Sequence, residues 1–201
     1  MFRPEIQRLM TVVVERRWSF EAYDQQVPRI AALVQDFKQQ WGDTVGWHHK
    51  AANYESYDHV ICSTGIPIRR SFFHQRRTPK MLVSIQRRKQ TPHFLHCFLC
   101  QWSAWACFVW ERYTPDGACE FSFVFETESQ EDSALRLRLE EILTQHGWQW
   151  LLPGEGTIPL PMIAPGVFTI DQPVVLRDIV FSGCAFALEY ADRVIDTPQV
   201  K

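Results

Sequence analysis

Three observations in the sequence predict an α+β fold: a mostly antiparallel sheet with two amphipathic helices on one side and a long proline-rich loop. Helical periodicity is confined to two stretches, runs rich in β-branched and aromatic residues fill residues 59–125, and proline and glycine concentrate in residues 153–178. With 201 residues and 46% hydrophobic content, the chain can bury one core. We therefore expect a single globular domain over residues 1–201.

Two elements are predicted before the β-rich region. Residues 11–18 contain three consecutive valines followed by charged residues, which indicates a strand that runs into solvent. In residues 27–41, apolar side chains recur three and four positions apart, which predicts an amphipathic helix. Pro28 is tolerated in a first helical turn, and Gly42 is placed to end the helix.

The central region predicts an antiparallel sheet. Its β-rich runs are residues 60–64, 66–73, 81–86, 94–110 and 119–125. The run 94–110 is too long for one strand, so we expect it to break near Gln101. The sequence Thr-Pro-Asp-Gly at residues 114–117 predicts a turn, which joins the last two runs as a hairpin.

The C-terminal part predicts a second helix, two more strands and the loop. Residues 130–146 carry an apolar stripe, with a capping box from Ser129 and Asp132 at the start and Gly147 at the end. Residues 148–152 and 179–188 are predicted strands. The stretch 153–178 predicts an extended loop, because proline fixes φ and removes a backbone donor. We favour a loop that covers a sheet face over one that binds a ligand.

Charge is divided unevenly along the chain. Residues 1–58, 59–110 and 111–201 carry net charges of −1, +8 and −9, which give the formal net charge of −2. The middle segment contains no Asp or Glu, and its six Arg and two Lys suit the recognition of phosphates or carboxylates. The candidate binding residues are Arg69, Arg70, Phe72, Phe73, His74, Arg76, Arg77, Lys80, Arg87, Arg88 and Lys89.

Three interpretations of this basic segment are open. Its arginines pair with the acidic C-terminal third of the same chain, or they converge on a rim of the sheet and dock an acidic protein. In the third interpretation the same rim binds nucleic acid, with Phe72, Phe73 and His74 stacking on bases. Strand alternation turns at least one of Phe72 and Phe73 inward, which counts against base stacking.

One group of residues resembles a zinc site and another resembles a catalytic cysteine loop, but the predicted geometry fits neither. A zinc set of His93, His96, Cys97 and Cys100 is disfavoured, because residues three apart on a strand point to opposite faces. The segment that begins at Cys62 resembles a cysteine phosphatase loop, but six residues separate its cysteine from the arginine where that loop has five. A strand is predicted after it where a helix N-terminus is required.

A further polar cluster, Trp-His-His-Lys at residues 47–50, is predicted to lie in a loop, where a histidine pair is usually a surface feature. We expect no catalytic residue, no metal and no cofactor. The lack of a secretory signal after Met1 and the six cysteines in mostly apolar runs predict a cytoplasmic protein. The uncharged stretch 94–110 is short for a membrane span.

The absence of catalytic motifs, the divided charge and the 13% aromatic content favour a small non-catalytic binding protein. Its general character is that of immunity proteins or assembly factors, and it docks an acidic partner through an arginine-rich sheet rim. The alternative is a nucleic-acid-binding protein that uses the same rim. The second alternative is an enzyme that acts on a phosphorylated substrate through Cys62 or His74.

Overall fold

The computed structural model describes residues 2–14, 20–49, 57–63, 66–68, 93–113, 119–122, 129–152, 154–160 and 175–181. Within these residues a six-stranded, mostly antiparallel sheet is packed against helices, which confirms the predicted α+β fold. The strands are β1 (Val45–His48), β2 (Tyr57–Ser63), β3 (His93–Cys100), β4 (Trp105–Tyr113), β5 (Cys119–Ser122) and β6 (Gln149–Trp150).

The first five strands lie side by side in sequence order. Every neighbouring pair among β1 to β5 is antiparallel. β6 differs, because it pairs in parallel with β4, where Trp105 lies opposite Gln149. Almost every residue of β2, β3 and β4 is buried, so both faces of the sheet are covered along these central strands.

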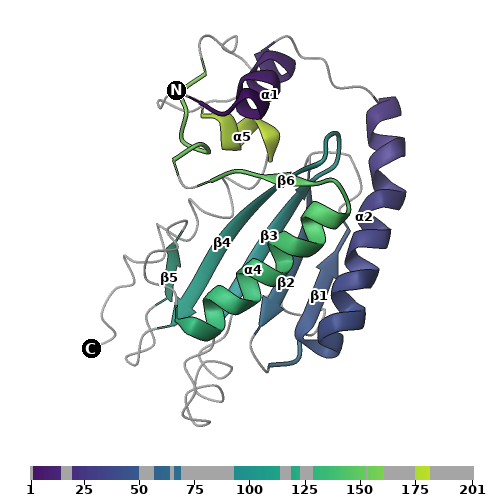
Figure 1. The fold of residues 1–201 in the computed structure, drawn as a ribbon, viewed down its shortest axis with the longest axis vertical. Coiled ribbons are helices and arrows are strands. Elements are labelled where there is room, and N and C mark those ends of the chain that lie inside the picture. The colour runs from purple at the N-terminus through teal and green to yellow at the C-terminus, as the bar shows by residue number, and fades with distance from the viewer. Residues whose placement is uncertain are drawn as a thin grey trace, which may run out of the picture.

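The helices of the described residues occupy two regions around the sheet. They are α1 (Pro4–Val14), α2 (Phe20–Trp41), α4 (Gln130–Gln145) and α5 (Leu176–Val180). Figure 1 shows α4 crossing one face of the sheet diagonally, with α2 standing along the β1 edge, while α1 and α5 lie together near one end of the strands. The short 3-10 turn η1 (Gly42–Thr44) connects α2 to β1.

Strand alternation gives the sheet two faces with different coverings. The α2/α4 face packs with residues of those two helices and is defined by Val60, Cys62, Leu95, Cys97, Leu99, Phe108 and Trp110. The α1/α5 face packs with residues of the other two helices and is defined by Tyr57, Phe98, Cys100, Cys107 and Val109. A smaller apolar cluster farther along the α1/α5 face consists of Ile61, Phe94 and Tyr113, with Ile66 and Ile68 against it.

The predicted break near Gln101 is confirmed. The run 94–110 is divided between β3 and β4, and residues 101–104 form the turn between them. The two strands pair as an antiparallel hairpin, in which Leu99 lies opposite Ala106. β4 also pairs with β5 as expected, with Tyr113 opposite Cys119, whereas residues 114–117 lie outside the described residues.

The start and end of α4 are confirmed as well. The Ser129 hydroxyl accepts a hydrogen bond from the Asp132 backbone N–H at 3.1 Å, and Asp132 Oδ2 accepts one from the Ser129 backbone N–H at 3.4 Å. This reciprocal pair is the predicted capping box. Gly147 ends the helix with φ of 69°, a conformation that glycine adopts without steric cost.

The prediction of a strand over residues 11–18 is wrong for its described part. Residues 11–14 belong to α1, and residues 15–18 lie outside the described residues. Ile6, Leu9 and Val13 follow helical spacing and are buried in the same cluster as α5. Tertiary burial of this stripe outweighs the local strand preference of consecutive valines.

α2 ends at Trp41 before Gly42 as predicted, but it begins at Phe20, seven residues earlier than predicted. Pro28 therefore lies inside the helix and not in its first turn. Proline removes the hydrogen bond to the carbonyl four residues earlier, which belongs to Asp24. Both Pro28 and Asp24 are exposed, so water can replace the lost donor.

The C-terminal strand prediction is corrected where the structure describes it. Ile179 and Val180 belong to α5, and residues 182–188 lie outside the described residues. Residues 176–178, which are predicted to belong to the loop, are also part of α5. The strand predicted at 148–152 is the shorter β6, and residues 66–68, predicted as strand, are irregular. Residues 64, 69–73, 81–86 and 123–125 of the predicted strands are not among the described residues.

Part of the predicted proline-rich loop is described and lies against the α1/α5 cluster. Pro159 and Val175 form an antiparallel bridge, and the Leu176 N–H donates to the Ile158 carbonyl at 2.9 Å. Ile158 and Leu160 are buried with α1 and α5. These residues pack on the core. Residues 153 and 161–174 lie outside the described residues.

Candidate functional site

The binding residues predicted from the sequence all fall in residues 69–89. The whole segment, from Arg69 to Lys89, lies outside the described residues. The convergence of its basic clusters on one rim therefore stays a prediction. The described parts of the molecule offer a different set of polar side chains, which is built around histidine.

The four cysteines whose side chains are described are buried free thiols. Cys97 lies on the α2/α4 face and Cys100 on the α1/α5 face, so the predicted separation of these two side chains is confirmed. Among the described residues, no three His, Cys, Asp or Glu side chains are grouped as metal ligands. Complete burial raises the pKa of the Cys62 thiol far above its ordinary value, because the thiolate would be desolvated. A buried thiol with a raised pKa does not favour Cys62 as a nucleophile, and the enzyme alternative stays a prediction.

Histidine–carboxylate pairs recur across the described residues. Seven histidines are present in the chain, and four of the six that the structure describes hydrogen-bond a carboxylate of another described residue through a ring nitrogen. Each pair joins side chains that different elements or turns supply. The pairs are His49 with Asp58, His93 with Asp132, His96 with Glu111, and His146 with Asp36.

One pair extends into a hydrogen-bonded chain across β2, β3 and β4. His59 Nε2 lies 2.8 Å from His96 Nδ1, and His96 Nε2 lies 2.7 Å from Glu111 Oε2. The Tyr113 hydroxyl donates to Glu111 Oε1. An ionised carboxylate only accepts, so His96 donates through Nε2, and its Nδ1 then accepts from His59 Nε2. We call these four residues the histidine relay.

The histidine relay lies on the α1/α5 face and is largely removed from water. His96 is 7% exposed and Glu111 is 3% exposed. The His59 ring stacks on Phe98 at 4.7 Å between centroids and on His96 at 5.0 Å. A buried carboxylate costs several kcal/mol unless hydrogen bonds compensate it. The relay supplies those hydrogen bonds, because donors from both sides, His96 and Tyr113, converge on the Glu111 carboxylate.

A second arrangement lies where β1 ends and β2 begins. Asp58 is 0% exposed, and its Oδ1 accepts from His49 Nδ1 at 2.8 Å and from Gln101 Nε2 at 3.3 Å. The His49 side chain is 38% exposed. A fully buried carboxylate thus fixes the orientation of an imidazole that reaches the surface.

The surroundings of His49 include an aromatic ring and a cation. The Trp47 ring centroid lies 5.9 Å from that of His49, and the planes are tilted by 55°. Lys38 Nζ lies 6.0 Å from the Trp47 ring centroid. Trp47 belongs to β1 and Lys38 to the last turn of α2, so the α2-to-β1 connection brings these groups together. The loop prediction for residues 47 and 48 is corrected, because both lie in β1.

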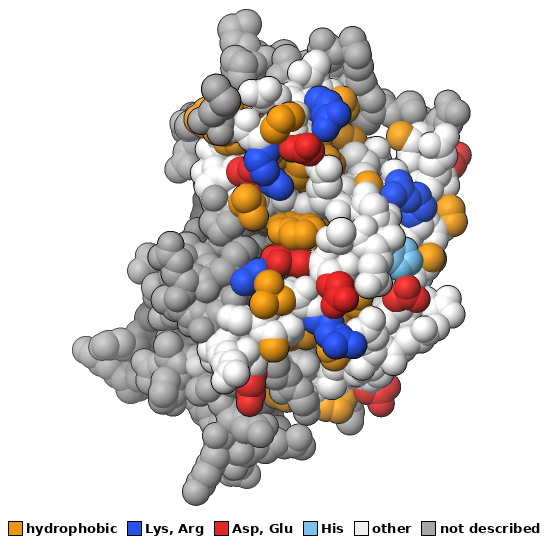
Figure 2. Space-filling model, viewed as in Figure 1, with side chains coloured by type: hydrophobic (Ala, Val, Ile, Leu, Met, Phe, Trp, Pro, Cys, Tyr) orange, Lys and Arg blue, Asp and Glu red, His pale blue; other side chains and the backbone are white. Residues whose placement is uncertain are grey.

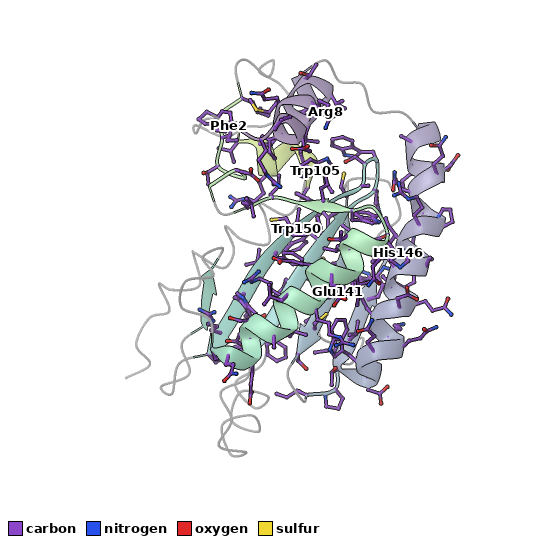
Figure 3. The ribbon with its side chains drawn as sticks, viewed as in Figure 1. Phe2, Arg8, Trp105, Glu141, His146 and Trp150 are labelled. Carbon is purple, nitrogen blue, oxygen red and sulfur yellow. The ribbon has the colours of Figure 1, made fainter. Side chains whose placement is uncertain are left out.

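The other two pairs hold elements together. His93 Nδ1 donates to Asp132 Oδ2 at 2.8 Å, which ties β3 to the capping box of α4. His146 Nε2 donates to Asp36 Oδ2 at 2.7 Å, and in Figure 3 His146 lies between the end of α4 and α2. Asp132 caps α4, and Asp36 joins α2 to the end of α4. A structural role therefore accounts for both carboxylates.

Comparison with protein-family models, with curated proteins and with solved structures found no match to this chain. Among the described residues, no helix combines the length and the apolar character needed to cross a membrane. The sequence interpretation missed the histidine relay, although alternation in β3 and β4 contains the necessary signal. With a turn at residues 101–104, the hairpin register places His96 and Glu111 on the same face.

Proposed function

We propose that the protein is a binding protein that docks an acidic partner protein through the basic segment 69–89. The observation that carries this proposal is the charge division: eight Lys and Arg fall in this segment, with no Asp or Glu from residue 59 to 110. A concentrated positive charge steers an acidic partner and fixes its orientation. In general character such a protein is similar to an immunity protein or an assembly factor.

The main competing explanation is neutralisation of the segment by acids of the C-terminal third. Several of the described acids in that third already have partners elsewhere in the molecule. Glu155 pairs with Arg3 at 2.5 Å and Glu140 with Arg136 at 2.6 Å. Asp132 accepts from His93 and lies 4.0 Å from Arg112. These pairings reduce the acidic charge left for the basic segment and support an external partner.

The charge distribution on the described surface also supports the proposal, because it differs from that of the basic segment. On the face that Figure 2 shows, basic and acidic side chains alternate over α1, α2 and α4 without a large area of one sign. Mixed charge of this kind gives little preference for a charged partner. The four cysteines whose side chains are described, Cys62, Cys97, Cys100 and Cys107, are free thiols, which fits the cytoplasmic location that we propose.

Reversal of two arginines tests the proposal. The double variant Arg76→Glu/Arg77→Glu should lose most of its partner binding in calorimetry or a pull-down, because four charge units change in the docking segment. Its melting temperature should stay close to that of the unmodified protein, since isolated surface charges contribute only about 0–1 kcal/mol each. The matched control is Arg8→Glu/Arg138→Glu, which changes the net charge equally at two exposed positions outside the segment.

Two results would contradict the acidic-partner proposal. One is a substantial fall in the melting temperature of the double variant, with partner binding by the folded fraction unchanged. That result would make the arginines internal partners of the acidic third. The other is capture of nucleic acid in place of protein, with the logarithm of duplex affinity falling against log salt by about 0.9 per phosphate contact.

A further inference from the structure

We propose that His49, oriented by Asp58, is the general base of a surface site that hydrolyses esters carrying an aromatic ring and an anionic group. This activity is separate from docking through the basic segment. It rests on the arrangement of His49, Asp58 and Gln101 and on the two groups beside them, Trp47 and Lys38.

The first step of the argument is the orientation of the imidazole. Asp58 has no exposed surface, and its Oδ1 accepts from His49 Nδ1. Because Nδ1 is committed to the carboxylate, the proton of the neutral ring sits there and Nε2 keeps its lone pair. No hydrogen-bond partner for Nε2 occurs among the described residues. A buried carboxylate behind an exposed imidazole is the arrangement that prepares histidine to accept a proton.

The second step compares His49 with the other carboxylate-bound histidines. The side chains of His93, His96 and His146 are 26%, 9% and 24% exposed, against 38% for His49. The carboxylates that hold His93 and His146 belong to helices, at the start of α4 and within α2. Asp58 lies in the sheet, where it also accepts a hydrogen bond from Gln101 Nε2. Among the described pairs, His49 therefore has the most accessible ring.

The third step identifies the substrate class. The half-buried Trp47 ring lies beside His49 and offers an aromatic surface for a planar group. The Lys38 ammonium lies on the same ring and can attract a carboxylate or sulfonate. An ester with an anionic aryl leaving group fits the three side chains together.

The reaction consumes one water molecule and needs no other reactant. His49 Nε2 takes a proton from water while the oxygen adds to the ester carbonyl. The tetrahedral intermediate then breaks its bond to the aryl oxygen, and His49 returns its proton to that oxygen. The products are a carboxylic acid and a phenol. Asp58 stays ionised throughout and stabilises the imidazolium that forms between the two transfers.

The probes are 4-acetoxy-3-nitrobenzoate, which is anionic, and p-nitrophenyl acetate, which is neutral. We expect the full chain to hydrolyse the anionic probe with saturation kinetics. His49→Gln should lower its kcat/KM at least tenfold, since a positioned general base contributes about 10²–10⁴-fold. Asp58→Asn should also lower it at least tenfold, because an amide favours the wrong tautomer. Lys38→Met should lower the rate with the anionic probe only.

The control is His146→Gln, which removes another carboxylate-bound histidine and should leave both rates unchanged. If Asp58→Asn fails to fold, His49→Gly decides the question: added imidazole should restore part of its activity with the anionic probe. Equal rates for the unmodified protein and His49→Gln would overturn the proposal, as would a lack of rescue by imidazole. A rate no greater than that of N-acetylhistidine at the same concentration would overturn it too.

Discussion

The two faces of the sheet are made by the same three long strands, but they are filled differently. On the α2/α4 face the centre is apolar, with Val60, Leu99 and Phe108 packed against two helices. On the α1/α5 face, His96 and Glu111 separate two apolar clusters. The centre of the α2/α4 face is stabilised by apolar packing, and its buried carboxylates Asp58 and Asp132 lie toward the ends of the strands. The α1/α5 face additionally depends on specific hydrogen bonds, so its stability should respond to changes that conserve volume.

The largest effect should come from breaking the histidine relay. Glu111→Ala removes the carboxylate that accepts hydrogen bonds from the buried side chains of His96 and Tyr113. Breaking a buried charged pair costs about 3–5 kcal/mol, and Glu111→Gln, which keeps the shape and one acceptor oxygen, should cost less. Denaturant unfolding measures the two values.

The α2/α4 face supplies the control for this experiment. Leu99→Met changes the shape of a fully buried side chain without introducing polarity, and such swaps usually cost less than about 1.5 kcal/mol. A Glu111→Ala variant that is no less stable than Leu99→Met would show that the two faces do not differ in the way we describe.

The buried thiols of the two faces should make the same kind of contribution to the loss of stability at alkaline pH. Cys62 and Cys97 lie on the α2/α4 face, and Cys100 and Cys107 on the α1/α5 face. Burial raises the pKa of all four thiols, and it raises those of Cys100 and Cys107 to about 12. Below the ordinary thiol pKa of about 8.5, folded and unfolded chains both keep their protons, so these groups add no pH dependence.

Above that pH the unfolded chain releases thiol protons and the folded chain retains them, so stability falls as pH rises. The loss continues until the folded thiols themselves ionise, at a pH of about 12 for Cys107. At pH 10 the loss is about 2 kcal/mol per thiol, since each pKa unit is worth about 1.4 kcal/mol. Cys107→Ala should reduce the difference in unfolding free energy between pH 8 and pH 10. An unchanged difference would mean that water reaches this thiol.

Features that a few neighbouring residues determine could be predicted from the sequence. The capping box of Ser129 and Asp132 and the glycine stop at Gly147 depend on local hydrogen bonds and φ, and α4 has both. α1 could not be predicted, because Val13 is buried in one cluster with Leu176 and Val180, more than 160 residues away. The pairing of His49 with Asp58 depends on how the chain returns between β1 and β2, and no local pattern encodes that path.

The smallest effect should come from the start of α4, and it should be confined to one face. Ser129→Ala removes the hydroxyl that accepts from the Asp132 N–H, and loss of such a cap costs about 1 kcal/mol. Because α4 packs on the α2/α4 face, amides of α4 should exchange hydrogen faster, while those of α1 keep their protection. The control is Thr144→Ala, an exposed change in the last turn of the same helix, which should alter stability by less than about 0.5 kcal/mol. Equal loss of protection in α1 and α4 would show that the two faces unfold as one unit.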